Sequence, residues 1–217
     1  MARADYKILI YLFAATLVFS SCKEKSIEPN TPTKTAAGDV LMINEGNFNW
    51  GNASLSLYNP NNKTIQHKVY ESANGRGLGD VAQSAVLING DWWVVVNNSG
   101  KIEVLDSSNF KVKQTITGFN SPRNICLLNG KVYITDLYTN EISIVNAISF
   151  QKEGNILLTG WTEEIVAQDT KLYALNKDSN AIYESNAGLS EFTKMVLEGS
   201  PVHLQQTGQG VLVALRT

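Results

Sequence analysis

The 217-residue chain contains little cysteine, little histidine and almost no net charge. It has two cysteines and two histidines, and 18 basic against 20 acidic residues leave a formal net charge of −2. Because there is no basic excess, nucleic acid is not an expected partner. His67 and His203 lie far apart in the sequence, so no metal cluster or catalytic triad is indicated. We therefore expect no enzymatic activity, no metal site and no catalytic cofactor.

Long apolar runs are also missing, apart from one near the N-terminus. Arg3 and Lys7 precede the 12-residue apolar run Ile8–Phe19, which is too short to span a bilayer. This order is typical of a signal peptide, here residues 1–22. Small residues followed by Cys22 resemble a bacterial lipoprotein box, which implies lipidation of Cys22 and a membrane anchor. The alternative is a secreted protein in which Cys22 is incidental.

Residues 23–38 are too polar to fold by themselves. They contain two prolines and several serines and threonines, and Ile27 is their one large apolar side chain. We expect a flexible tether that leads to a globular part at residues 39–217. The start Lys23-Glu24-Lys25 partly resembles the acidic tag that sends lipoproteins of Bacteroides-like bacteria to the cell surface. This resemblance implies an outer-membrane protein that faces the cell exterior.

The remaining cysteine, Cys126, lies within a strand-like pattern, so a buried and unreactive thiol is expected there. No intrachain disulfide is expected if Cys22 carries lipid.

The globular part repeats itself about every 40 residues. Trp93, Tyr133 and Tyr173 recur at that spacing, and so do Ile102, Ile142 and Ile182. Around each of them, apolar and polar residues alternate with the period of a β-strand, and Asn-Gly pairs precede two of the copies. A repeat of this length that holds about four short strands is typical of a β-propeller blade. The predicted fold class is therefore all-β, a propeller of four-stranded blades.

The repeat divides the globular part into blades. The predicted blades are residues 39–79, 80–120, 121–160 and 161–199, with a partial blade at 200–217. The first blade is expected to contain strands Val40–Asn44 and Ser54–Tyr58 and an outer strand Ile65–Glu71. About 4.5 blades are fewer than most propellers need for closure, so we expect a truncated propeller. There are two alternatives: another chain completes the propeller, or N-terminal strands close a ring of five blades.

Two motifs resemble known propeller families. Val132–Asp136 followed by Asn140–Asn146 resembles the YVTN-type propeller repeat. Asn44–Phe48 and Gly51–Ser56, together with the lipoprotein start, are similar to surface-exposed propeller lipoproteins of Bacteroides-type bacteria that capture vitamin B12. That resemblance implies seven blades, a bound cobalamin or related corrinoid, and delivery to a TonB-dependent outer-membrane transporter. The alternative is an envelope propeller that binds protein partners and no small molecule.

The candidate site lies where the loops of one propeller face meet. The connection Glu45–Ala53 is longer than its counterparts and carries aromatic residues. Aromatic and amide side chains suit a flat ligand fringed by amides, such as a corrin. The candidate ligand-binding residues are Phe48, Asn49, Trp50, Asn52, Arg76, Asp80, Asn98, Arg123, Tyr138, Trp161 and His203. Alternatively, each of them is a turn residue or packs at a blade edge.

Two other motifs carry less weight. Gly75–Gly79 lacks the strand–helix context of a dinucleotide-binding loop, and Asn176–Asn180 lacks the glycine and glutamate of a calcium loop. A hydrolase with a metal in its channel would need polar inner strands, whereas residues 85–87, 125–127 and 165–167 are apolar.

Overall fold

The structure, a computed structural model, describes residues 35–36, 38–186 and 188–216. These residues form seventeen β-strands and one short helix, so the expected all-β class is confirmed. The predicted signal peptide, Cys22 and most of the predicted tether lie outside the described residues. Within the described ranges, no helix has both the length and the hydrophobicity that crossing a bilayer requires.

The strands form five antiparallel sheets, and within each sheet they follow one another in chain order. The first sheet contains β1 (Val40–Asn44), β2 (Ser54–Asn59) and β3 (Thr64–Gln66). The second contains β4 (Ala82–Ile88), β5 (Asp91–Val96), β6 (Lys101–Asp106) and β7 (Val112–Thr117). The third contains β8 (Pro122–Leu128), β9 (Lys131–Asp136), β10 (Glu141–Asn146) and β11 (Lys152–Leu157). The fourth contains β12 (Thr162–Gln168), β13 (Lys171–Asn176), β14 (Ala181–Ser185) and β15 (Phe192–Val196), and the last contains β16 (Ser200–Thr207) and β17 (Gly210–Arg216).

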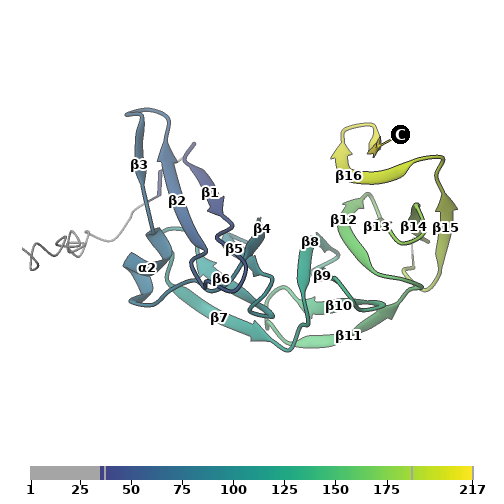
Figure 1. Cartoon of the computed structure of the whole chain (residues 1–217), viewed down its shortest axis with the longest axis horizontal. Helices are drawn as coiled ribbons and strands as arrows, with labels where there is room; N and C mark the ends of the chain where they lie inside the picture. Colours follow the sequence, from purple (N-terminus) through teal and green to yellow (C-terminus); the bar gives the residue numbers. More distant parts are fainter. Residues whose placement is uncertain (1–34, 37, 187, 217) are drawn as a thin grey trace, which may run out of the picture. The chain divides into compact units, whose positions relative to one another are not determined.

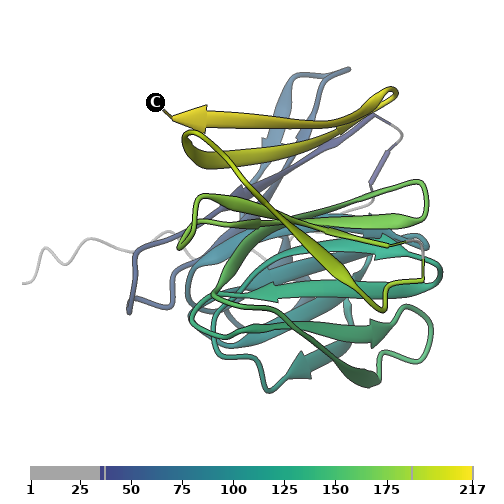
Figure 2. The same cartoon turned by 90° about the vertical axis from the view of Figure 1, so that its right-hand side faces the viewer.

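Successive sheets pack against one another, and their first strands are in contact. β4 contacts β8, β8 contacts β12, and β12 contacts β16, although about 40 residues separate each pair. Figure 1 shows these strands on the inner side, with β7, β11 and β15 on the outer side. The view in Figure 2 shows the sheets stacked face to face. This is the arrangement of propeller blades, and it confirms the predicted fold as a partial propeller.

The core lies in the seams, the interfaces between neighbouring sheets. Side chains alternate along each strand, so Trp93 and Val95 of β5 face the third sheet, whereas Val94 and Val96 face the first. All four side chains are fully buried. Each blade therefore contributes one apolar face to each of two cores, which explains why a single blade cannot fold alone.

The first sheet holds the second, third and fourth strands of a blade. Its pairs Leu41–Leu57 and Ile43–Leu55 match Trp93–Val104 and Val95–Ile102 of the second sheet. β16 and β17 correspond to the first two strands of a blade, because they follow β12 and β13 at the 40-residue spacing.

The predicted outer strand Ile65–Glu71 is wrong. β3 ends at Gln66, Lys68 adopts a left-handed conformation with φ 56°, and helix α2 (Val69–Asn74) follows. A strand cannot continue through a left-handed residue. The helix buries Tyr70 and Val69 in the seam with the second sheet, and this burial outweighs the β propensity of the segment.

Two further features bear on the sequence predictions. Cys126 is buried, as expected, and burial raises the pKa of its thiol well above the ordinary value. Thr35, from the predicted tether, donates from its hydroxyl to the carbonyl of Ser107 at 2.9 Å. The end of that segment therefore contacts the second sheet.

Candidate functional site

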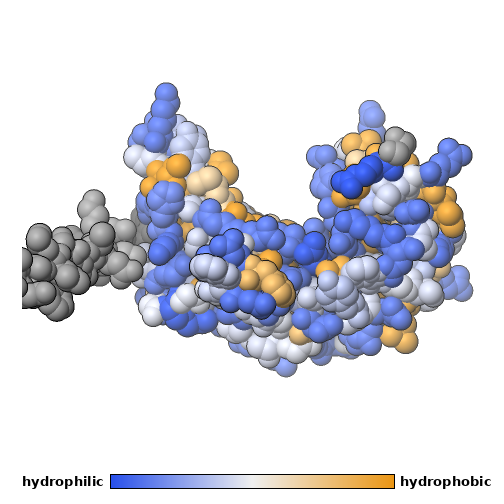
Figure 3. Space-filling view, in the orientation of Figure 1, coloured by the Kyte–Doolittle hydropathy of each residue, from blue (hydrophilic) through white to orange (hydrophobic). Residues whose placement is uncertain are grey.

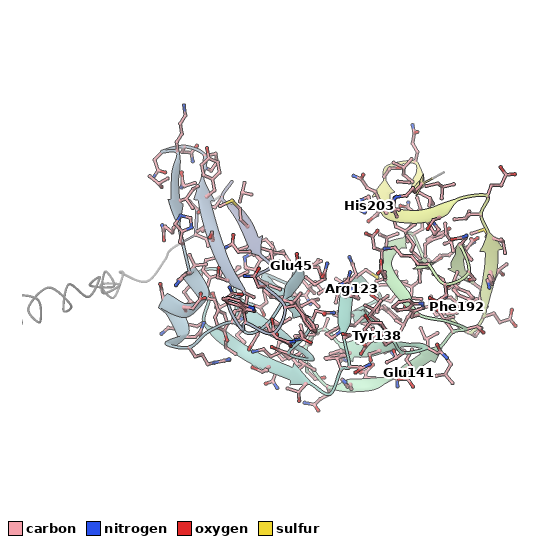
Figure 4. The ribbon with its side chains drawn as sticks, in the orientation of Figure 1. Glu45, Arg123, Tyr138, Glu141, Phe192 and His203 are labelled. Carbon is pink, nitrogen blue, oxygen red and sulfur yellow. The ribbon has the colours of Figure 1, made fainter. Side chains whose placement is uncertain are left out.

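A pocket of about 460 Å³ lies where five connections meet, and we call it the loop pocket. The connections are the long loop after β1, the β5–β6 turn, the β9–β10 turn and the segments that lead into β4 and β8. The lining residues are Glu45, Gly46, Asn47, Phe48, Val81, Asn97, Asn98, Ser121, Arg123, Leu137 and Tyr138. In Figure 4, Glu45, Arg123 and Tyr138 lie near the inner strands, whereas Phe192 and Glu141 lie toward the outer ones. Figure 3 shows a mainly hydrophilic surface with separate hydrophobic areas.

Backbone bonds hold the long loop in place. The Asn52 side chain accepts a hydrogen bond from the Asn47 N–H at 2.8 Å, and the Ala82 N–H donates to the Glu45 carbonyl at 3.1 Å. Gly46 has φ 80°, and a Cβ there would lie 2.7 Å from the Ala53 nitrogen, so glycine is required. Asn52 thus shapes the loop instead of lining the pocket.

A hydrogen-bonded group links this loop to the β5–β6 turn. One Asp80 oxygen accepts from the Asn98 amide at 2.6 Å and from the Asn49 N–H at 2.8 Å. The Asn98 amide also donates to the Asn49 side chain at 3.1 Å. The structure therefore brings together three predicted residues that lie 18 to 49 positions apart.

The aromatic residues differ in their surroundings. Phe48 and Tyr138 line the pocket and remain 65% and 68% exposed. Tyr138 stacks on Trp161, with ring centroids 5.0 Å apart and an interplanar angle of 27°. Trp50 is 75% exposed and does not line the pocket. The pocket wall thus presents the Phe48 and Tyr138 rings, and Trp161 supports Tyr138 from outside the lining.

Arg123 is held at the inner edge of the pocket. One terminal nitrogen donates to the Gln83 side chain at 2.7 Å, and the other lies 3.8 Å from Glu163. The Arg123 carbonyl accepts from the Ser84 hydroxyl at 2.9 Å. The register of β8 shifts between Pro122 and Ile125, and such a bulge redirects the intervening side chains.

Comparison with protein families identifies the family of the chain. A family model described as "Domain of unknown function (DUF5074)" matches residues 38–210. The chain belongs to the DUF5074 family. No curated protein matches this DUF5074 chain.

Solved structures similar to the DUF5074 chain are propellers and related proteins. A candidate 6-phosphogluconolactonase from Bacteroides uniformis is 13% identical, with a TM-score of 0.61 over 82% of this chain and 61% of its own. The Pan2 WD40 domain of Neurospora crassa is 10% identical, with a TM-score of 0.60 over 83% of this chain and 57% of its own. Hydrazine synthase of Kuenenia stuttgartiensis is 16% identical, with a TM-score of 0.54 over 59% and 39%. The chain spans less than two thirds of these structures, and such low identities support the fold alone.

Four of the eleven predicted site residues line the loop pocket, namely Phe48, Asn98, Arg123 and Tyr138. Of the other seven, Arg76 and His203 belong to contacts elsewhere in the fold. Arg76 pairs with Glu103 at 3.2 Å and covers the Tyr70 ring at 5.3 Å, so it belongs to the seam between the first two sheets. His203 is 58% exposed and bonds to Glu164 at 3.1 Å, which joins β16 to β12. Figure 4 shows His203 on β16, apart from the other labelled residues near the pocket.

Sequence reasoning missed Gln83 and Glu163, two polar residues at one repeat position. They form a row with the predicted residues Arg123 and His203, because all four recur at the 40-residue spacing near the start of each inner strand. Glu163 also contacts Lys177, so charged side chains continue from the pocket onto β12. The spacing alone could have identified this row, had the inner strands been compared from their first residues. Among the described residues, no three potential metal ligands cluster.

Proposed function

We propose that this DUF5074 chain is a non-enzymatic, cell-surface lipoprotein that captures cobalamin or a related corrinoid in the loop pocket. It would pass the ligand to a TonB-dependent outer-membrane transporter. The observation that carries this proposal is the pocket itself, which combines Phe48 and Tyr138 with Asn97 and Asn98, while Trp161 stacks on Tyr138 from outside the lining. The opening motif and the lipoprotein-like start, which resemble vitamin B12-capturing lipoproteins, supply the identity of the ligand.

The chemistry of a corrin matches these side chains. A corrin is a flat macrocycle with amide groups around its edge. Exposed aromatic rings can stack on or contact its faces. The Asn98 N–H groups already bond to Asp80 and Asn49, so its carbonyl oxygen is the group that can accept from the peripheral amides. A volume of about 460 Å³ can hold one part of such a ligand, with the remainder lying across the open loops.

Titration calorimetry on the purified full chain in detergent, with a panel of cobamides, tests the proposal. We expect binding to the wild type. Tyr138→Ala should weaken it about 5- to 30-fold, because removing an aromatic surface costs about 1–2 kcal/mol. Trp50→Ala is the matched control, since it removes an exposed ring of the first loop outside the pocket. The proposal is refuted if no corrinoid in the panel produces heat of binding or a spectral shift.

The anchoring part of the proposal concerns Cys22. The apolar run before this residue and the polar segment after it support lipidation there. Radiolabelled fatty acid should enter the wild type in cells and not the Cys22→Ala variant. Equal labelling of both proteins would show that Cys22 is not the acceptor.

The second candidate function is a scaffold for an envelope protein. The Trp50 ring favours it, because a ring that is 75% exposed and does not line the loop pocket is typical of an anchor for a protein surface. Cross-linking in cells at position 50 distinguishes the two functions. A protein partner captured through Trp50, with no corrinoid binding in the titration, supports the scaffold.

A further inference from the structure

Arg123 leaves most of its hydrogen-bonding capacity unused. A guanidinium has five N–H donors. Among the described residues, one firm bond is made, to Gln83 at 2.7 Å, while Glu163 at 3.8 Å lies beyond hydrogen-bonding distance. The side chain is nevertheless only 24% exposed, so its stem is packed and its position is restricted. The remaining donors therefore face solvent from a fixed place.

Arg123 is also the single lysine or arginine among the residues that line the loop pocket. Other basic side chains nearby are occupied: Arg76 and Lys101 bind Glu103, and Lys177 contacts Glu163. Because Lys177 partly neutralises Glu163, that carboxylate does not fully cancel the charge of Arg123. A fixed guanidinium with free donors suits bidentate binding of a phosphate or carboxylate.

We propose that Arg123 forms an anion subsite of the loop pocket and that it binds a phosphate group of the ligand. This inference rests on the proposed function, in which the ligand is a corrinoid. Complete cobamides carry a phosphate between the macrocycle and the lower base. Phe48 and Tyr138 would contact the macrocycle while Arg123 fixes the phosphate, so the subsite would select complete corrinoids over precursors that lack the phosphate.

Glu45 opposes this preference and provides a second test. It lines the same pocket and its side chain is exposed, so its carboxylate repels an anion held nearby. Glu45→Gln removes this repulsion without touching Arg123. The phosphate preference should therefore rise in that variant.

The experiment compares cobinamide with cobinamide phosphate, which differ by the phosphate group alone. Affinities are measured by absorbance titration on the full chain in detergent. We expect the wild type to bind the phosphate form about 10-fold more tightly, since one charge-assisted bond contributes on that order. Arg123→Gln should abolish this preference, so that its affinities for cobinamide and cobinamide phosphate agree within about two-fold.

Lys194→Gln is the control for net charge, because Lys194 is exposed on β15 and does not line the pocket. It should retain the preference. If Arg123→Gln does not fold, two other measurements test the subsite. The preference for the phosphate form should increase in Glu45→Gln, and in the wild type it should decrease at higher salt.

Two outcomes overturn the subsite. If the wild type binds both corrinoids equally, or Arg123→Gln keeps the preference, the subsite is wrong while the proposed function stands. If neither corrinoid binds, the proposed function fails and the subsite fails with it.

Discussion

Two seams of the propeller have the same strand arrangement but are packed by different side chains. Between the second and third sheets, the fully buried Trp93 meets Phe150 with ring centroids 5.6 Å apart. The Lys152 ammonium lies 3.7 Å from the centre of the Phe119 ring and donates to the Gly118 carbonyl. Aromatic rings and the stem of a lysine thus close this seam.

The next seam, between the third and fourth sheets, has other side chains at the positions of Phe119, Phe150 and Lys152. Thr159 stands 40 residues after Phe119, and Phe192 stands 40 residues after Lys152. Leu189 adopts the left-handed conformation of Phe150, with φ 55° against 59°. A hollow of about 420 Å³ lies among Thr159, Leu189 and Phe192. The comparison teaches that the repeat sets the backbone, whereas individual side chains set the packing density.

The largest expected loss of stability comes from a substitution in the seam between the second and third sheets. Trp93→Ala should cost about 3–5 kcal/mol in the free energy of unfolding, because the ring is fully buried and leaves a cavity. Tyr173→Ala, at the same repeat position in the fourth sheet, should cost less, because Tyr173 is half-buried. Urea unfolding of both variants measures the difference. Equal losses would show that the Trp93 seam and the seam between the fourth and fifth sheets, which Tyr173 faces, contribute alike.

A second prediction concerns the seam between the first and second sheets, which contains the buried carboxylate of Glu103. The Glu103 carboxylate has no exposed surface and accepts from Lys101 at 2.5 Å and Thr115 at 2.7 Å. Burial raises the pKa of Glu103, but these bonds and Arg76 outweigh burial and hold it below its ordinary value. Glu103→Gln should therefore cost about 2 kcal/mol at neutral pH.

The sign of this pKa shift sets the pH dependence. Since the pKa of Glu103 is lower in the folded state, its ionised form stabilises the fold above the ordinary pKa of 4.5. That stabilisation is lost as the pH falls below 4.5 and through the folded-state pKa. The stability difference between wild type and Glu103→Gln should therefore shrink in acid. Thermal melts across this range check it, and a constant difference would contradict the assignment.

A third prediction fills the hollow seam. Leu189→Phe should raise the free energy of unfolding by about 0.5–1.5 kcal/mol, the usual gain from filling a cavity. No extra backbone strain is expected, because phenylalanines at positions 110 and 150 already adopt this left-handed conformation. Phe150→Leu is the reciprocal variant and should lose about 1 kcal/mol or more. A loss of stability in Leu189→Phe would mean that the seam is closed by other atoms.

The smallest effect is expected at Trp50, which lies in no seam. With 75% of the residue exposed, Trp50→Ala should change the free energy of unfolding by less than about 0.5 kcal/mol. The same residue type is thus essential at position 93 and dispensable for folding at position 50. A clear drop in the melting temperature of Trp50→Ala would show that this ring is a structural plug.

The sequence alone predicted the blades, because their signals are local. Alternating burial locates the strands, and the Asn-Gly turns at 89–90 and 129–130 have positive φ at both residues, as this pair favours. The exception is the segment after β3. There the burial of Tyr70 against a neighbouring sheet selects a helix, and no local pattern announces that contact.

The candidate site was predicted in part. The sequence indicated the long loop and the turns that line the pocket, since lengthened loops with aromatic residues stand out within a regular repeat. It grouped Arg76 and His203 with them, and the structure places these two side chains elsewhere. It did not indicate Gln83, which holds Arg123. Loop membership follows from sequence, whereas the direction of a side chain depends on twist and bulges.

What the sequence by itself determined is therefore the repeat, the strands and the loops that meet on one face. The tertiary structure decided which side chains meet across the seams, such as Asn98 with Asn49 and Arg123 with Gln83. The reason is physical. Strand periodicity comes from backbone geometry within a few residues, but contacts between blades depend on the twist of whole sheets and on register shifts that turn side chains to another face.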